Sequence, residues 1–209
     1  MNETQSRLNL CIYDVIDTSS NKHFCDLWKI RPKFKQKEVK YCKWSPPAEG
    51  VTLLSTDGSI TDYGGFGGVF RDFTNKRVLA FGGKEEPQTI TYHEMKAISR
   101  GLDITLEHGL SKLIINTDSS LMVQYIKNGV KPPWRCKDLL ANIKDKSARL
   151  EFFDIVHIYR EINGGAHFMA SHQIDLGESL LAPNQFPTEL NVIRIRDGSG
   201  HVYVFFPLI

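Results

Sequence analysis

Three acidic residues lie where the surrounding pattern predicts burial. Asp57 follows the apolar run 51–54, Glu94 falls in the first turns of a predicted helix, and Asp118 follows the apolar run 113–115. Two strand ends and one helix start can bring the three carboxylates together. Converging carboxylates repel one another, and burying an unpaired charge costs several kcal/mol. Because a divalent cation neutralises such a cluster, the three residues predict a metal site.

Each acid taken alone also suits a structural role. An Asp at the end of a strand often forms a turn or caps a helix, and a Glu near the start of a helix interacts favourably with the helix dipole. The metal interpretation therefore depends on the ordered set of three acids rather than on any one of them.

The length of 209 residues accommodates one domain of about 150 residues with appendages. Hydrophobic residues make up 41% of the chain, and no apolar run of about 18 residues indicates a membrane span. The first residues do not form the hydrophobic core of a signal peptide, so we expect an intracellular protein, in either the nucleus or the cytoplasm. The cysteines show no paired CxxC spacing, and we expect reduced thiols at Cys11, Cys25, Cys42 and Cys136.

The net charge of +2 does not by itself indicate nucleic-acid binding, but the cations are unevenly distributed. Segment 29–43 combines cations with interleaved or flanking aromatic residues: Lys29, Arg31, Lys33, Lys35, Lys37, Lys40 and Lys43, with Trp28, Phe34, Tyr41 and Trp44. Cations can contact phosphates and aromatic rings can stack on bases. A lysine-rich tract can equally keep a solvated tether extended, so both interpretations stay open.

The Pro-rich stretch 45–50 predicts a boundary, and the apolar pattern after it predicts the element order βββαβααβα. The predicted strands are 51–59, 66–72, 77–82, 112–117 and 153–159, and the predicted helices are 91–108, 119–128, 135–150 and 165–176. We therefore divide the chain into a basic N-terminal extension or linker (1–44), a folded domain (45–178) and a C-terminal extension (179–209). In that extension, alternating residues on both sides of 197–200 predict a β-hairpin.

Seven short motifs follow one another between residues 44 and 170. They are Trp44-Ser45-Pro46-Pro47, Thr56-Asp57-Gly58-Ser59, Gly67-Gly68-Val69-Phe70-Arg71-Asp72, Glu94-Met95-Lys96-Ala97, Thr117-Asp118-Ser119, His157-Ile158-Tyr159-Arg160-Glu161-Ile162-Asn163 and Ala166-His167-Phe168-Met169-Ala170. Together they make residues 44–176 resemble the ribonuclease H family, especially the ribonuclease H-like domains of plants that are related to retroelement reverse transcriptases. The resemblance implies an α/β ribonuclease H-like fold with a mixed five-stranded sheet flanked by helices. It also implies endonucleolytic hydrolysis of the RNA strand in RNA–DNA hybrids.

The resemblance implies that Asp57, Glu94 and Asp118 are catalytic residues that bind two Mg²⁺ ions. Asp57 would bridge the ions, while Glu94 and Asp118 would hold the ion on the leaving-group side. Two such ions, about 3.5–4 Å apart, activate water and stabilise the leaving alkoxide. The expected substrate-binding residues are Gly58, Ser59, Gly65 and Arg160, where Arg160 can instead pair with an acid such as Glu161.

The sequence departs from the family pattern at the fourth acid, because His167 stands in its place. A neutral imidazole is a softer ligand that suits Mn²⁺ or Zn²⁺ better than Mg²⁺, so Mn²⁺ is a second candidate cofactor. Glu161 or Asp175 can supply a compensating carboxylate. His167 can equally be a hydrogen-bonded helix residue, in which case the domain is a degenerate module that binds RNA or hybrid without cleavage. A protein-interaction domain with neither property is a third alternative.

One further histidine falls within a predicted strand. His157 lies in the apolar run 155–158, and we expect a partly buried structural residue there rather than a proton shuttle.

Overall fold

A computed structural model of the chain describes residues 14–35, 39–76, 78–172 and 177–205. The chain divides into two compact units, one of residues 1–41 with 204–209 and the other of residues 42–203. The boundaries at residues 45 and 178 stay a prediction.

The N-terminal unit contains two short strands and a helix. β1 (Asp14–Ile16) pairs in parallel with β2 (Lys33–Lys35), and α2 (Ser19–Leu27) connects them. Cys25 and Ile30 are buried. The sequence pattern predicted no element here, because a strand of three residues is too short to show a period of two.

A mixed sheet of six strands forms the centre of the larger unit, in the order β8-β7-β4-β5-β6-β9. β4 is parallel to β7 and β7 to β8, whereas the other neighbours are antiparallel. The strands are β4 (Thr52–Ile60), β5 (Gly64–Arg71), β6 (Val78–Glu85), β7 (Lys112–Thr117), β8 (Phe152–His157) and β9 (Gly177–Leu181). The predicted α/β class and mixed sheet are confirmed, and β9 corrects the predicted strand number from five to six.

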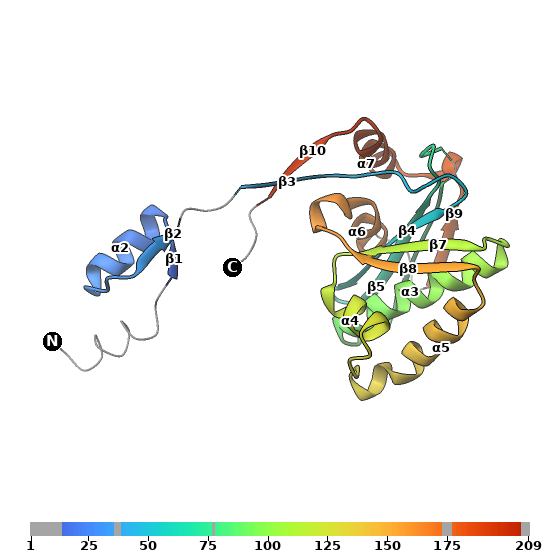
Figure 1. Cartoon of the computed structure of the whole chain (residues 1–209), viewed down its shortest axis with the longest axis horizontal. Coiled ribbons are helices and arrows are strands. Elements are labelled where there is room, and N and C mark those ends of the chain that lie inside the picture. Colours follow the sequence, from blue (N-terminus) through green and yellow to red (C-terminus); the bar gives the residue numbers. More distant parts are fainter. Residues whose placement is uncertain (1–13, 36–38, 77, 173–176, 206–209) are drawn as a thin grey trace. The chain divides into compact units, whose positions relative to one another are not determined.

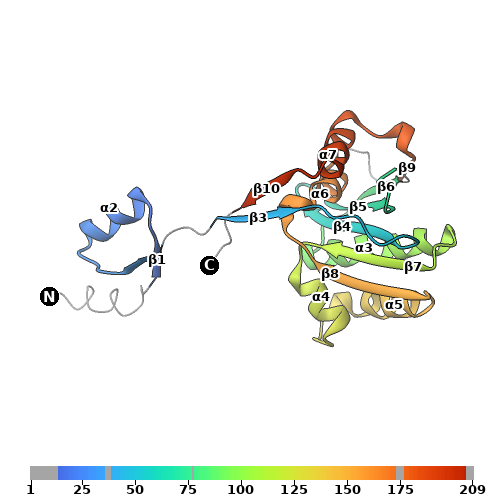
Figure 2. The same cartoon turned by 45° about the horizontal axis from the view of Figure 1, so that its top comes forward.

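Helices cover both faces of this sheet (Figures 1 and 2). α3 (Ile90–Glu107), α4 (Ser120–Lys127) and α5 (Lys137–Ala148) contribute to the larger hydrophobic core, with the fully buried side chains Ile98, Leu102, Met122 and Ile143. α6 (Gly164–Ser171) and α7 (Thr188–Gly198) enclose a second core with β5 and β6, built on Val69, Ala80, Met169 and Leu190. Three short 3₁₀ helices span Trp134–Cys136, Arg160–Ile162 and Pro183–Gln185.

The predicted C-terminal hairpin is wrong, because residues 191–196 belong to α7. The strand that follows, β10 (Val202–Phe205), pairs with β3 (Lys40–Lys43) instead. Val192, Ile193 and Ile195 mimic a strand, and Asp197-Gly198 mimics a hairpin turn. Tertiary contacts override this local pattern, since Leu190 and Asp197 lie on one buried side of a helix.

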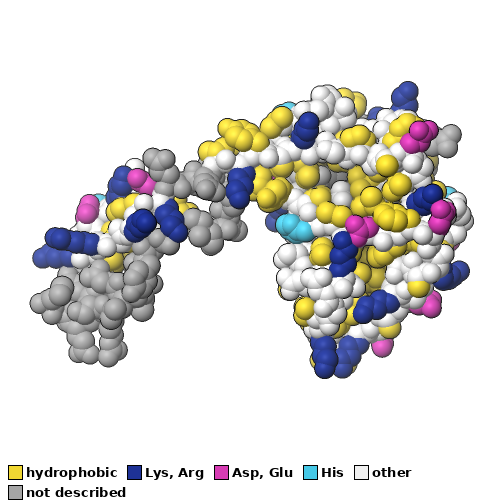
Figure 3. Space-filling model, viewed as in Figure 1, with side chains coloured by type: hydrophobic (Ala, Val, Ile, Leu, Met, Phe, Trp, Pro, Cys, Tyr) yellow, Lys and Arg dark blue, Asp and Glu magenta, His cyan; other side chains and the backbone are white. Residues whose placement is uncertain are grey.

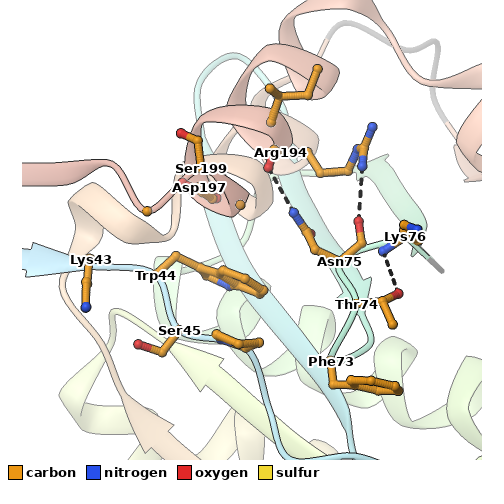
Figure 4. A pocket seen from close by; sticks show the side chains of 14 residues that line it. Lys43, Trp44, Ser45, Phe73, Thr74, Asn75, Lys76, Arg194, Asp197 and Ser199 are labelled. Atoms are coloured by element: carbon orange, nitrogen blue, oxygen red, sulfur yellow. Dashed lines mark hydrogen bonds between the residues drawn. The ribbon is translucent and has the colours of Figure 1, made fainter.

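The contacts that hold α7 come from residues distant in sequence. Asp197 accepts a hydrogen bond from Arg71 Nη1 at 2.7 Å and another from the Tyr203 hydroxyl at 2.6 Å. Asn75, in the β5–β6 turn, forms two hydrogen bonds of 3.1 Å with Arg194 (Figure 4). The side-chain nitrogen of Asn75 donates to the backbone carbonyl of Arg194, and Arg194 Nη1 donates to the backbone carbonyl of Asn75. Trp44 and this turn line an open cleft of about 610 Å³ beside α7, and none of the three predicted metal ligands lines it.

Within the described ranges, no helix is long and apolar enough to cross a membrane. Cys25, Cys42 and Cys136 are free thiols, as predicted, and Cys11 lies outside the described residues.

Candidate metal centre

Asp57 lies on β4 with its carboxylate directed toward the face covered by α6. Side chains alternate along a strand, so Asp57 shares this face with Ser59, while Leu54 packs on the opposite side in the core with α3. The Asp57 side chain is only 6% exposed. Its Oδ1 accepts a hydrogen bond of 3.0 Å from the Gly58 backbone amide, which is a weak compensation for a buried charge.

Glu94 projects from the second turn of α3, which Thr89 begins by accepting a hydrogen bond from the Tyr92 backbone amide. Gly58 makes this position possible. A Cβ at Gly58 would lie 2.5 Å from the Glu94 backbone nitrogen, so only glycine lets α3 approach β4 this closely. Gly58, predicted to bind substrate, is therefore a contact between the elements that carry Asp57 and Glu94; substrate binding by it stays a prediction.

Asp118 comes directly after β7 and completes the cluster. One oxygen from each of Asp57, Glu94 and Asp118 lies within 4.8 Å of the others. Because β4 and β7 are parallel neighbours, the residues after Thr56 and Thr117 lie at the same end of the sheet. The predicted convergence of the three acids is confirmed.

Burial and mutual repulsion make it unfavourable for the carboxylates of the cluster to be ionised together. Burial, followed by the charges of Asp57 and Asp118, raises the pKa of Glu94 to about 9. Burial and then the charge of Asp118 raise the pKa of Asp57 to about 6, although His167 and the Gly58 amide oppose the shift. Glu94 Oε2 is buried and has no hydrogen-bond partner among the described residues. A set of hard carboxylate oxygens with such an orphaned atom fits a divalent cation.

We expect the free energy of unfolding of the metal-free protein to fall as the pH rises from about 4.5 to about 9, the window that the Glu94 pKa values define. In this window the folded state retains a proton on Glu94 that the unfolded state has released, so stability decreases with pH. Asp57 adds to the slope up to about pH 6. Urea unfolding in EDTA at several pH values measures the effect. Glu94→Gln should flatten the curve, and an unchanged slope in this variant would show that Glu94 is not its source.

His167 lies on α6, and its Nδ1 is 2.8 Å from Asp57 Oδ2. The approach of α6 depends on glycines of β5, because a Cβ at Gly67, which pairs with Asp57, would lie 2.5 Å from the Ala170 backbone nitrogen. The glycines of β5 therefore allow the backbone of α6 to approach the sheet closely. The His167 side chain is 43% exposed, so its ring borders both Asp57 and solvent. Whether His167 is a metal ligand stays a prediction.

Asn163, the last residue of the motif 157–163, is a site residue to which the sequence analysis gave no role. Its side-chain nitrogen donates to the Thr56 carbonyl at 3.0 Å and to Asp118 Oδ1 at 3.1 Å, and the residue is only 1% exposed. Asn163 therefore fixes the Asp118 carboxylate relative to β4. Local sequence pattern could not predict these two contacts, since the partners of Asn163 lie 107 and 45 residues away in sequence.

We expect Asn163→Ala to weaken Mn²⁺ binding about 10- to 100-fold, because residues that orient metal ligands typically contribute that much. Isothermal titration calorimetry without substrate measures the affinity. Asn191→Ala is the matched control, since it also removes an amide bound to a backbone carbonyl, that of Phe186. Equal affinities in wild type and Asn163→Ala would show that Asp118 is positioned without this hydrogen bond.

The other predicted site residues are distributed around the cluster. The Ser59 hydroxyl donates to the Ala170 carbonyl at 2.6 Å, and the buried Gly65 packs against the same carbonyl group. Arg160 is exposed in the 3₁₀ turn before α6, and its positive charge acts to lower the Glu94 pKa, which places it near the acids. The substrate-binding roles of Ser59, Gly65 and Arg160 stay predictions.

Glu161 and Asp175 are the two candidates for a compensating carboxylate ligand. Glu161 does not belong to the acidic cluster formed by the described residues; burial, followed by the charge of Glu161, raises the pKa of the Cys42 thiol. Asp175 lies outside the described residues. The expected burial of His157 is wrong, because this residue ends β8 and is exposed, with its ring 6.2 Å from that of Tyr159.

Solved structures share this architecture. RNase H1 from the halophilic archaeon Halobacterium salinarum is 16% identical, with a TM-score of 0.54 over 57% of this chain and 93% of that chain. The N-terminal RNase H domain of rv2228c from Mycobacterium tuberculosis is 21% identical, with a TM-score of 0.53 over 57% of this chain and 89% of that domain's chain. LC11-RNase H1, isolated from compost by a metagenomic approach and solved in complex with an RNA/DNA hybrid, is 25% identical, with a TM-score of 0.53 over 59% and 96%. These similarities confirm the predicted ribonuclease H-like fold.

Comparison of this sequence with known proteins and protein families identifies the family of the chain. A search of curated proteins found no match. The family model described as reverse transcriptase-like matches residues 55–173, which is more than half of the chain and includes Asp57, Glu94, Asp118, Asn163 and His167. The chain therefore belongs to the reverse transcriptase-like family.

Proposed function

We propose that this protein is a metal-dependent endonuclease that hydrolyses the RNA strand of RNA–DNA hybrids. The observation that carries the proposal is the cluster of Asp57, Glu94 and Asp118, whose oxygens lie within 4.8 Å of one another in a ribonuclease H-like fold. LC11-RNase H1, 25% identical to this chain, was solved with an RNA/DNA hybrid, which supports the same class of substrate here.

The metal ligands would be the three carboxylates, with Asp57 shared between two ions and His167 as a further ligand. Divalent ions in such a site supply an activated water and stabilise the leaving oxygen. The oxygen donors suit Mg²⁺, whereas the His167 imidazole favours Mn²⁺. Because Nδ1 of His167 faces Asp57, the ring nitrogen that remains for a ligand role is Nε2.

Side chains around the cluster would orient the metal ligands and neutralise the charge of the bound strand. Asn163 holds Asp118 through a hydrogen bond of 3.1 Å and so preserves the spacing of the cluster. Arg160, exposed beside the acids, would contact a phosphate of the bound strand. Selectivity for RNA would come from contacts to 2′-hydroxyl groups, which DNA lacks, with Gly58, Ser59 and Gly65 as the proposed contact residues.

The contact between His167 and Asp57 favours a second candidate function. The hydrogen bond of 2.8 Å engages Asp57 Oδ2, an oxygen that a second ion would need. If the ring keeps this position, the domain would bind RNA or hybrid without cleaving it. The two candidates differ in turnover and share hybrid binding.

A panel of duplexes tests both candidates. An RNA–DNA hybrid, an RNA duplex and a DNA duplex of one sequence would be incubated with Mg²⁺, Mn²⁺ or EDTA, and binding would be measured in parallel in EDTA. Metal-dependent cleavage of the hybrid alone is the result that the first proposal predicts. Hybrid binding without cleavage in either metal would favour the second, and absence of both would overturn the two together.

A further inference from the structure

The charges of the chain are partitioned between its N-terminal segment and the rest. Residues 1–43 contain nine basic residues (Lys and Arg) and five acidic residues (Asp and Glu). Residues 44–209 contain seventeen basic and nineteen acidic residues. The segment with the acidic cluster is thus net negative, although its proposed substrate is a polyanion. Sequence-independent affinity for nucleic acid depends on cations that displace counterions from phosphates. The excess of cations for that purpose lies in the N-terminal segment.

The fold of the N-terminal unit arranges several of these cations in a row. Residues 31–35 lead into and form β2, and exposure alternates along them: Arg31, Lys33 and Lys35 are exposed, while Pro32 and Phe34 are partly buried. Alternating residues of an extended chain point to the same side and are about 6.6 Å apart along it. The three cations therefore form a row on one side of the segment, hereafter the cationic row.

The opposite side of β2 is occupied by α2. Lys22, on α2, lies with its Nζ 5.8 Å from the centre of the Phe34 ring, so Phe34 faces the helix and the cationic row faces away from it. Figure 3 shows Lys and Arg side chains gathered on this unit around few acidic ones. Exposed aromatic residues lie on α2 and just after it, where the Phe24 and Trp28 rings are 6.2 Å apart and each residue is about half exposed.

We propose that the N-terminal unit is a nucleic-acid-binding element in which the cationic row contacts the phosphate backbone of the substrate. A duplex carries one charge per about 1.7 Å of axis, so a row of three cations meets several phosphates. The element binds by charge and without base specificity, and the exposed Phe24 and Trp28 rings offer stacking surfaces for unpaired bases. The choice of substrate rests on the proposed function, whereas the binding itself does not depend on cleavage.

The salt dependence of binding tests the proposal. Affinity of the full chain for a fluorescent RNA–DNA hybrid would be measured by anisotropy in EDTA, where cleavage does not interfere, between about 50 and 200 mM salt. The triple variant Arg31→Gln, Lys33→Gln, Lys35→Gln should reduce the slope of log affinity against log salt by about 0.9 per lost phosphate contact. If three contacts are lost, raising the salt from about 50 to 200 mM should weaken binding by the triple variant about 40-fold less than binding by wild type.

Two controls separate charge from folding. Arg31→Lys, Lys33→Arg, Lys35→Arg keeps the charges and should keep the wild-type slope. Lys76→Gln, Lys144→Gln, Arg149→Gln removes three exposed cations from the larger unit and should change the slope less than the first variant does. An unchanged slope in the first variant, or an equal reduction in the last, would overturn the proposal. Hybrid binding with this pattern but without cleavage would leave the binding element standing while the nuclease proposal fails.

Discussion

Replacing Asp57 with Asn is expected to reduce hybrid cleavage by on the order of 10³-fold or more while leaving hybrid affinity within about threefold. Asn keeps the size of the side chain and can still accept the hydrogen bond of 3.0 Å from the Gly58 amide. It removes the charge that the proposed ions share. Because Asp57 raises the pKa of Glu94, its neutralisation should also raise the melting temperature of the metal-free protein.

Asp103→Asn is the matched control for this variant. Asp103 lies on α3, the helix that carries Glu94, and pairs with Lys146 at 2.6 Å outside the acidic cluster. Its loss should leave cleavage essentially unchanged. Initial rates at saturating hybrid, together with thermal unfolding in EDTA, measure both effects. Retained cleavage in Asp57→Asn would remove this residue from the mechanism.

Replacing His167 with Asp is expected to raise Mg²⁺ affinity about 10- to 100-fold and to make Mg²⁺ a better cofactor relative to Mn²⁺. The substitution restores a carboxylate where the imidazole contacts Asp57 at 2.8 Å. A fourth acid adds a hard oxygen ligand, but it also adds repulsion to a cluster that already raises the pKa of Glu94 to about 9. The variant should therefore be less stable than wild type in EDTA and gain more stability when metal is added.

Calorimetry with each metal and cleavage rates in each metal measure this prediction. His172→Asp provides the control, because His172 ends the same helix and its ring packs on that of Phe168 at 4.9 Å, away from the three acids. The control should not change the preference between metals. If His167→Asp lowers the affinity for both metals, the imidazole is a better ligand than the carboxylate at this position, and the Mn²⁺ assignment gains support.

The parts of the site that the sequence predicts are those set by local pattern. Asp57 and Asp118 follow buried strands, Glu94 lies near the start of an amphipathic helix, and each pattern is contained within a few residues. Parallel pairing of β4 with β7 then brings the strand ends together. For this reason the convergence of the three acids was predictable.

The remainder depends on contacts between distant residues. Asn163 donates hydrogen bonds to the Thr56 carbonyl on β4 and to the Asp118 carboxylate after β7. The residues next to Asn163 in the sequence do not predict either contact. The same holds for α7, where the buried pair of Asp197 with Arg71 outweighs an alternating pattern that suggested a strand. Local propensity is a weak guide when one buried ion pair and one apolar contact fix the orientation of an element.

The strands that the sequence did not predict are also short. β1 and β2 contain three residues each, and β9 contains five, so none of them shows a sustained period. Their strands are stabilised by pairing with a neighbour rather than by their own composition, as β9 is by pairing with β6.

The proposed nuclease activity would be tested with one RNA–DNA hybrid whose two strands carry different fluorophores, with the products resolved on a single denaturing gel. Wild type and Asp57→Asn, purified in parallel, would be compared in Mn²⁺, in Mg²⁺ and in EDTA. We expect internal fragments of the RNA strand only, produced by wild type with metal and absent with Asp57→Asn or EDTA. Cleavage of the DNA strand, or equal RNA fragments from both proteins, would contradict it.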